Sequence, residues 1–213
     1  MSDNIHAKIN QSSFARKTKK ITLYPCARIF GQVYSKNKDL IPKGITLHYT
    51  AGASATSTIV HLESVGFGYH LLIDRDGTVW QMYYLDSTCS HAGKASWKGF
   101  SPNLNHISIA LCSFGLLTHS KNIKDVFLNE YKHEVTQVSY RQNQYWEPAT
   151  QEQEDSLYDV CLWLCRSFNI DPDHICGHSE ACLPRGRKID PGGVLGYEMS
   201  YFRKIMRNLR NQV

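Results

Sequence analysis

The sequence lacks any long hydrophobic run. Its uninterrupted apolar stretches are only a few residues long, whereas a helix that spans a bilayer needs about 20 apolar residues. The N-terminal stretch MSDNIHAKINQSSFARKTKK also lacks the apolar core of a secretory signal. We therefore expect no membrane insertion, and we expect synthesis in the cytoplasm without a signal peptide.

Two other features are absent, a disulfide framework and a strong charge of one sign. The seven cysteines are an odd number without repeated spacing, which favours reduced thiols. The net charge is +5, from 24 Lys and Arg against 19 Asp and Glu, and so diffuse an excess does not indicate binding to nucleic acid. What is present, 213 residues of which 42% are hydrophobic, predicts one domain with a real core.

Hydrophobic periodicity predicts four strands and a short helix. Alternating residues favour strands at residues 44–49, 69–74, 78–83 and 107–112. Arg75-Asp76-Gly77 joins the second and third of these, and an Asp-Gly pair is typical of a hairpin. Residues 54–65 carry apolar side chains at helical spacing.

Two further helices are expected towards the C-terminus. One begins near Pro148, where Thr150 and Gln153 form a T-x-x-Q capping box. A continuous apolar stripe follows at Leu157, Val160, Cys161, Leu164, Cys165 and Phe168. The other begins at about Glu198. Strands that alternate with helices predict a layered α/β domain.

The domain is expected to cover residues 44–213, after an N-terminal arm and lead-in segment at 1–43. Residues 116–147, with weak periodicity, are interpreted as an insertion. Aromatic and cationic side chains alternate there: Tyr131, Tyr140, Tyr145, Trp146, Lys121, Lys124, Lys132 and Arg141. The insertion either shapes a substrate groove or is a surface excursion whose aromatics cover the long helix.

Two separate segments could together hold a metal. His48 lies near the end of a predicted strand, just before a turn of small residues. Residues 176–193 read as a loop that contains His178, Glu180, Lys188, Asp190 and two thiols. Catalytic zinc uses three nitrogen, sulfur or carboxylate ligands and keeps one position open. His48, His178 and one acid or thiol of the loop would meet this requirement.

Five motifs occur in an order that is typical of a known family: LHYTAG (47–52), GYHLLIDRDGTVWQ (68–81), SHAG (90–93), HISIALC (106–112) and GHSE with GRKIDPGG (177–193). Over about 150 residues, from Gly44 to Gly193, the chain resembles the type 2 N-acetylmuramoyl-L-alanine amidases and peptidoglycan-recognition proteins. The resemblance implies a single α/β domain with a central mixed β-sheet flanked by helices.

The resemblance also implies one zinc ion per chain, bound by His48, His178 and Asp190. Cys182 is the competing third ligand, because some phage relatives close the site with a thiolate. The GRKIDPG match favours Asp190. Glu180 is expected to be solvated or to brace the loop.

Catalytic and substrate-binding roles are likewise implied by the resemblance. Lys188 and Tyr69 match residues that stabilise the oxyanion formed when water attacks the amide. His91 and Thr50 lie on segments that the family places at the substrate groove. Some family members carry a glutamate as general base where this chain has Ala110, which leaves the identity of the base open.

The function that these matches imply is zinc-dependent cleavage of the amide bond between N-acetylmuramic acid and the L-alanine of the stem peptide. The partner would be peptidoglycan or a muropeptide, reached in the periplasm or on the cell wall after lysis or specialised secretion. A secreted effector would also have an immunity or delivery protein. The alternatives are a non-catalytic muropeptide-binding module of the same fold and a polymerase-binding regulator that uses the basic stretch at residues 16–20 of the N-terminal arm.

Overall fold

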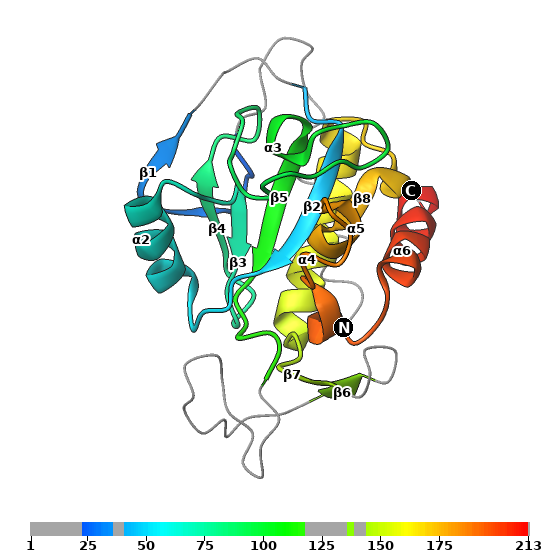
Figure 1. The fold of residues 1–213 in the computed structure, drawn as a ribbon. Coiled ribbons are helices and arrows are strands. Elements are labelled where there is room, and N and C mark those ends of the chain that lie inside the picture. The colour runs from blue at the N-terminus through cyan, green and yellow to red at the C-terminus, as the bar shows by residue number, and fades with distance from the viewer. Residues whose placement is uncertain (1–22, 36–40, 118–135, 139–143, 213) are drawn as a thin grey trace.

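A computed structural model describes residues 23–35, 41–117, 136–138 and 144–212 (Figure 1). The elements in chain order are β1 (Arg28–Tyr34), β2 (Gly44–Tyr49), α2 (Ala55–Val65), β3 (Leu71–Ile73), β4 (Val79–Tyr83), α3 (Pro102–Asn105), β5 (His106–Leu111), β6 (Thr136–Val138), β7 (Gln144–Trp146), α4 (Gln151–Ser167), the 3-10 turn η2 (Pro172–His174), β8 (Ile175–Gly177), α5 (His178–Ala181), η3 (Gly192–Leu195) and α6 (Met199–Asn211).

The centre of the molecule is a six-stranded mixed sheet in the order β1-β4-β3-β5-β2-β8. β3 and β4 pair antiparallel, which confirms the predicted hairpin, whereas β2 pairs in parallel with both β5 and β8. β2 therefore lies between two strands, and its backbone is hydrogen-bonded on both edges. The expected mixed sheet flanked by helices is confirmed.

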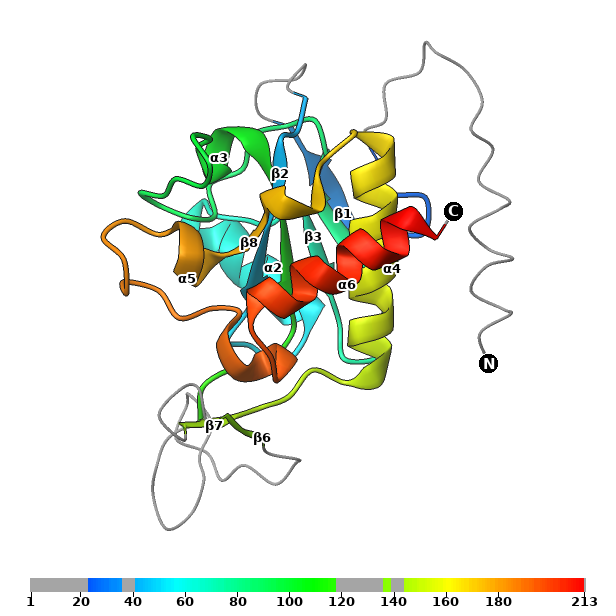
Figure 2. The ribbon, with the colours of Figure 1, turned by 90° about the vertical axis from the view of Figure 1, so that its right-hand side faces the viewer.

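The two faces of the sheet are covered differently. Figure 2 shows α4 and α6 together on one face and α2 on the other. Ile45 and Leu47 point into the core beneath α4 and α6. His48 lies on the opposite face, because it is in register with Ala110 of β5, which is itself in register with Leu72 of the α2 cluster. No helix in the described part of the chain is long and apolar enough to cross a membrane.

Local signals explain the elements that were predicted correctly. The Thr150 hydroxyl accepts the N–H of Gln153, and the Gln153 side chain accepts the N–H of Thr150, so the predicted capping box starts α4. The Ser54 side chain caps α2 by accepting the N–H of Ser57. The structure also contains β1, an edge strand within the predicted lead-in segment. Residues 176–193 begin with the end of β8 and with α5, not as a loop from the start.

The expected insertion at 116–147 is described only at its ends and at β6, so most of its aromatics and cations lie outside the described residues. The two ends are joined, since the N–H of Leu117 donates to the Tyr145 carbonyl and the N–H of Glu147 donates to the Gly115 carbonyl, both at 2.9 Å. Trp146 is fully buried in the main core. This tryptophan is a core residue and does not face a substrate groove.

Candidate metal centre and active site

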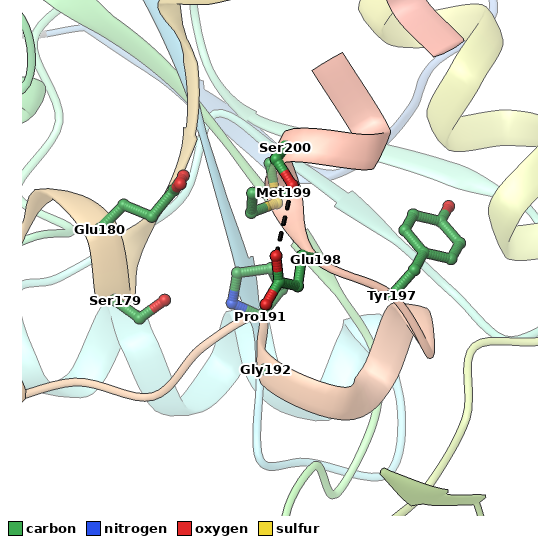
Figure 3. Close-up of a pocket in the computed structure, with 8 residues that line it drawn as sticks. All are labelled: Ser179, Glu180, Pro191, Gly192, Tyr197, Glu198, Met199 and Ser200. Atoms are coloured by element: carbon green, nitrogen blue, oxygen red, sulfur yellow. Dashed lines mark hydrogen bonds between the residues drawn. The ribbon is translucent and has the colours of Figure 1, made fainter. Parts of the chain in front are cut away.

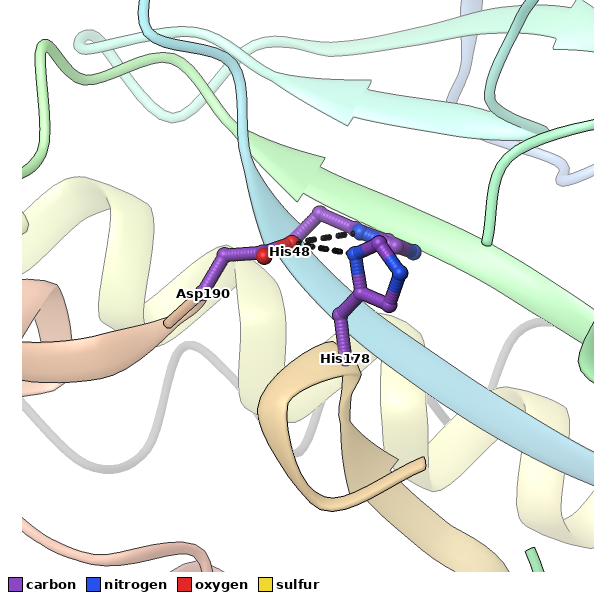
Figure 4. Close-up of side chains that lie close together, drawn as sticks. All are labelled: His48, His178 and Asp190. Atoms are coloured by element: carbon purple, nitrogen blue, oxygen red, sulfur yellow. Dashed lines mark hydrogen bonds and ion pairs between the residues drawn. The ribbon is translucent and has the colours of Figure 1, made fainter. Parts of the chain in front are cut away.

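Three side chains from distant parts of the chain meet on the α2 face of the sheet. His48 comes from β2, His178 is the first residue of α5, and Asp190 lies just before η3 (Figure 4). All three are buried, with 1%, 3% and 9% of their surface exposed. The pairing of β8 with β2 explains this meeting, because it places the start of α5 beside the end of β2.

The donor atoms of this cluster are close enough to share one ion. Nδ1 of His48 lies 2.7 Å and Nδ1 of His178 lies 3.0 Å from Oδ2 of Asp190. In the described part of the chain, these residues form the one group whose ligand atoms all lie within 4.8 Å of one another. Two imidazoles and one carboxylate are a donor set of catalytic zinc sites. The role of the three residues as metal ligands stays a prediction, and their geometry fits it.

The hydrogen bond behind His178 adds a second argument for a cation. Nε2 of His178 lies 2.9 Å from the carbonyl oxygen of Ala92. A carbonyl can only accept, so Nε2 carries the proton and Nδ1 of the neutral ring presents a lone pair. That lone pair faces the Asp190 carboxylate, which is also an acceptor. Two facing acceptors repel unless a cation or a proton lies between them.

Burial and pairing shift the ionisation of the cluster in opposite ways. Burial alone would raise the pKa of Asp190, but the two imidazoles of His178 and His48 held against the carboxylate outweigh it and keep the pKa well below its usual range. Burial lowers the pKa of His48, although the nearby Asp190 carboxylate opposes the shift. Asp190 is therefore ionised and His48 is neutral at pH 7, the protonation states that a metal requires.

Of the two predicted catalytic residues, Tyr69 packs against this cluster and Lys188 lies in the loop that carries Asp190. The Tyr69 ring centroid is 5.0 Å from that of His48. Burial raises the pKa of Tyr69, so its hydroxyl stays protonated and can donate a hydrogen bond. Lys188 is exposed, and its charge helps to lower the pKa of the His48 imidazole, after the larger effect of burial. Ala110 is buried directly opposite His48 in β5.

The two residues predicted to touch substrate have partners within the protein. His91 bonds His48 through Nδ1 at 2.9 Å and the Pro102 carbonyl through Nε2 at 3.1 Å. Thr50 Oγ1 accepts the N–H of Gly52 at 3.1 Å, which braces the turn after β2. Their role in binding substrate stays a prediction.

The competing ligand Cys182 is outside the cluster. Its thiol points at the carbonyl oxygens of Ser179 and Pro184, each 3.5 Å from Sγ. Glu180 pairs with Arg203 through two bonds of 2.8 and 2.9 Å and accepts the N–H of Gly177. Glu180 therefore braces the loop, as predicted for it.

A cleft of about 380 Å³ lies next to the Asp190 turn (Figure 3). Its lining residues come from α5, the turn after Asp190 and the start of α6: Ser179, Glu180, Pro191, Gly192, Tyr197, Glu198, Met199 and Ser200. None of the three clustered donors is among them. The cleft is thus separate from the candidate metal centre.

Comparison with known proteins gives one family and several similar folds. The family model described as N-acetylmuramoyl-L-alanine amidase matches residues 37–193. Among solved structures, the amidase AmiD from E. coli, in complex with the substrate anhydro-N-acetylmuramic acid-L-Ala-D-gamma-Glu-L-Lys, is 20% identical, with a TM-score of 0.56 over 77% of this chain and 57% of that one. The chain thus spans little more than half of AmiD.

Two further structures match more of this chain. The N-acetylmuramoyl-L-alanine amidase LysC from Clostridium intestinale URNW is 18% identical, with a TM-score of 0.56 over 87% of this chain and 98% of that one. AmpDh3 from Pseudomonas aeruginosa, in complex with anhydromuramic pentapeptide, is 16% identical, with a TM-score of 0.57 over 87% and 67%. A comparison with curated proteins finds no match. At these identities the structures establish the shared fold.

Proposed function

The chain belongs to the N-acetylmuramoyl-L-alanine amidase family, and we propose that it is a zinc-dependent enzyme that hydrolyses the amide bond between the lactyl group of N-acetylmuramic acid and L-alanine. The observation that carries the proposal is the buried convergence of two imidazole nitrogens and one carboxylate oxygen within 4.8 Å. A buried carboxylate between two histidines costs solvation free energy unless a cation compensates it.

His48, His178 and Asp190 would hold one zinc ion per chain and leave a coordination position open. When bound, zinc supplies Lewis acidity, which polarises a carbonyl and lowers the pKa of water. Burial of all three ligands excludes competing water from the protein side of the site. This exclusion strengthens each electrostatic interaction with the substrate.

Tyr69 and Lys188 would stabilise the negative charge that develops on the carbonyl oxygen. Tyr69 contributes a protonated hydroxyl from the wall of the site, and Lys188 contributes an ammonium from the loop that carries Asp190. Fixed donors of this kind are among the largest contributions to catalysis. Ala110 cannot take a proton, so β5 supplies no general base at this position.

The substrate class follows from the family and from the ligands of the similar structures. AmiD is in complex with an anhydromuramoyl peptide and AmpDh3 with an anhydromuramic pentapeptide. We therefore propose a muropeptide or peptidoglycan as substrate. The complete donor set favours the enzyme over a binding module of the same fold, since a module that only binds has no need of it.

Metal content and product analysis test the proposal together. Purified protein should contain one zinc per chain and release peptides with a free N-terminal L-alanine, which mass spectrometry identifies. His48→Ala, His178→Ala and Asp190→Ala should lose both zinc and activity, while Cys182→Ser should keep both. Cleavage by a metal-free wild-type protein would overturn the mechanism, and a zinc-free Cys182→Ser variant would overturn the ligand assignment.

A further inference from the structure

Residues 91–93 lie against both histidines of the metal centre. His91 contacts Nε2 of His48, and the Ala92 carbonyl contacts Nε2 of His178. We propose that this segment, held by Asn103, is a positioning element that fixes both histidines with the proton on Nε2, so that both Nδ1 lone pairs point at the metal position. The inference rests on the zinc site proposed above.

The proton positions can be followed from a backbone carbonyl inward. The Pro102 carbonyl can only accept, so His91 must donate to it from Nε2, at 3.1 Å. Neutral His91 then has a bare Nδ1, which accepts from Nε2 of His48 at 2.9 Å. His48 therefore carries its proton on Nε2 and presents a bare Nδ1 to Asp190, 2.7 Å away.

His178 reaches the same state by a shorter route. Its Nε2 donates directly to the Ala92 carbonyl, which leaves its Nδ1 bare. The same carbonyl accepts a hydrogen bond from Nη2 of Arg187 at 2.9 Å. Arg187 thus ties the loop that carries Asp190 to the residue that orients His178. Consecutive residues, His91 and Ala92, set the tautomers of the two histidines.

Asn103 holds this segment in place. Its Oδ1 accepts the N–H groups of His91 and Ala92 at 3.1 and 2.8 Å, and its Nδ2 donates to the Gly93 carbonyl at 2.8 Å. One side chain therefore makes three hydrogen bonds to three successive residues. Asn103 lies in α3, next to Pro102, so the same short helix supplies the acceptor for His91.

The expected consequence is a change in metal affinity without a change in any ligand. Partners that orient a metal-binding histidine typically contribute ~10–100-fold to metal affinity. Without an acceptor at His91, the His48 ring is free to move its proton to Nδ1, where it would hydrogen-bond Asp190 and block the metal. His91 acts through His48, so its role is positioning.

The test compares two substitutions of His91 with one of another buried histidine. His91→Asn keeps an acceptor near the position of Nδ1, and His91→Leu removes it. His106→Leu is the control, because His106 is also buried, with 3% exposed, but contacts Thr46 and the Cys176 thiol and none of the three proposed ligands. Zinc affinity is measured by competition with a chelator, and long-range ¹H–¹⁵N spectra of the zinc-loaded proteins report which ring nitrogen carries the proton.

We expect Nε2–H tautomers for His48, His91 and His178 in the zinc-loaded wild type. His91→Leu should bind zinc ~10–100-fold more weakly, His91→Asn should remain close to wild type, and His106→Leu should lower stability but not affinity. Wild-type affinity in His91→Leu, or an Nδ1–H tautomer of His48 in the wild type, would overturn the inference. A wild type that binds no zinc would instead refute the proposed function, while the spectrum of His91, which is not a ligand, would still decide whether its proton lies on Nε2.

Discussion

A single methyl group at Gly193 is predicted to disturb the loop that carries Asp190. A Cβ added there would lie 2.4 Å from Cγ and 2.5 Å from Cδ1 of the Trp146 indole, against 3.4–4 Å for ordinary contacts. The indole is fully buried, so it cannot turn outward into solvent without disturbing its neighbours. Gly193 does not have a positive φ, so alanine suits its backbone and the effect of Gly193→Ala is steric.

The magnitude follows from the required displacement. Either the indole or the turn must move by about 1 Å, and overpacking of a core on this scale costs ~1–3 kcal/mol of unfolding free energy. Asp190 lies three residues before Gly193, so movement of the turn should also weaken zinc binding. Trp146→Leu leaves a cavity and is destabilising by itself. In the double variant the added methyl fills part of that space. The double variant should therefore lose ~1–2 kcal/mol less unfolding free energy than the two single variants lose together.

The coupling free energy comes from guanidinium chloride denaturation of the metal-free wild type, Gly193→Ala, Trp146→Leu and the double variant. Chelator competition gives their zinc affinities. Gly196→Ala is the control, because Gly196 has a φ of +71° and nothing within 4 Å of its added Cβ. It should cost ~1 kcal/mol through backbone strain and show no coupling to Trp146→Leu. Additive free energies for Gly193→Ala and Trp146→Leu would refute the steric reasoning.

Further predictions concern catalysis, pH and the segment between Leu117 and Gln144. Lys188→Ala should keep zinc and lower turnover by ~10²–10³, and Tyr69→Phe should lower it with the fold intact; wild-type turnover would remove both from the mechanism. Burial lowers the pKa of His106 to about 4. The contribution of this neutral imidazole to the free energy of unfolding is present above its unfolded pKa of about 6.5, and about 3 kcal/mol of stability is lost as the pH falls to 4. His106→Asn should flatten this part of the stability profile measured by denaturation between pH 7 and 4, and an unchanged profile would contradict the assignment. Deletion of residues 118–143 with a short Gly-Ser link should leave a folded, zinc-binding protein, because backbone hydrogen bonds already join the two ends of the segment. If the segment shapes a substrate groove, the variant should lose more activity on intact sacculi than on a small muropeptide. Equal loss on both substrates would reject the groove interpretation.

The elements that the sequence predicted are those with local determinants. The capping box of Thr150 and Gln153 and the Asp76-Gly77 turn lie within a few residues of the structure they specify. By contrast, β8 has three residues, Ile175–Gly177, and is a strand because it pairs with β2. Nothing in its own sequence distinguishes it from a loop. Short elements that depend on distant partners cannot be recognised from local periodicity.

The candidate ligands were predictable for a different reason. His48, His178 and Asp190 lie within contiguous motifs that resemble a family, so their types and order could be read together. The motifs did not reveal that His91 contacts His48, although SHAG was recognised as a whole. Asn103 lies outside every quoted motif, and its three hydrogen bonds depend on the position of α3.

The position of Asp190 depends on residues that are remote from it in sequence. Trp146 lies beneath Gly192 and Gly193 on one side of the turn, and Arg187 bonds the Ala92 and Lys94 carbonyls on the other. Both contacts act on the backbone. They therefore limit the position of the Asp190 carboxylate, although neither Trp146 nor Arg187 makes its contact with the carboxylate itself. Substitutions at Trp146 or Arg187 should therefore lower zinc affinity with the three ligands intact. Zinc content and activity should fall in parallel in such variants, whereas a loss of activity at full zinc content would assign Arg187 to substrate binding.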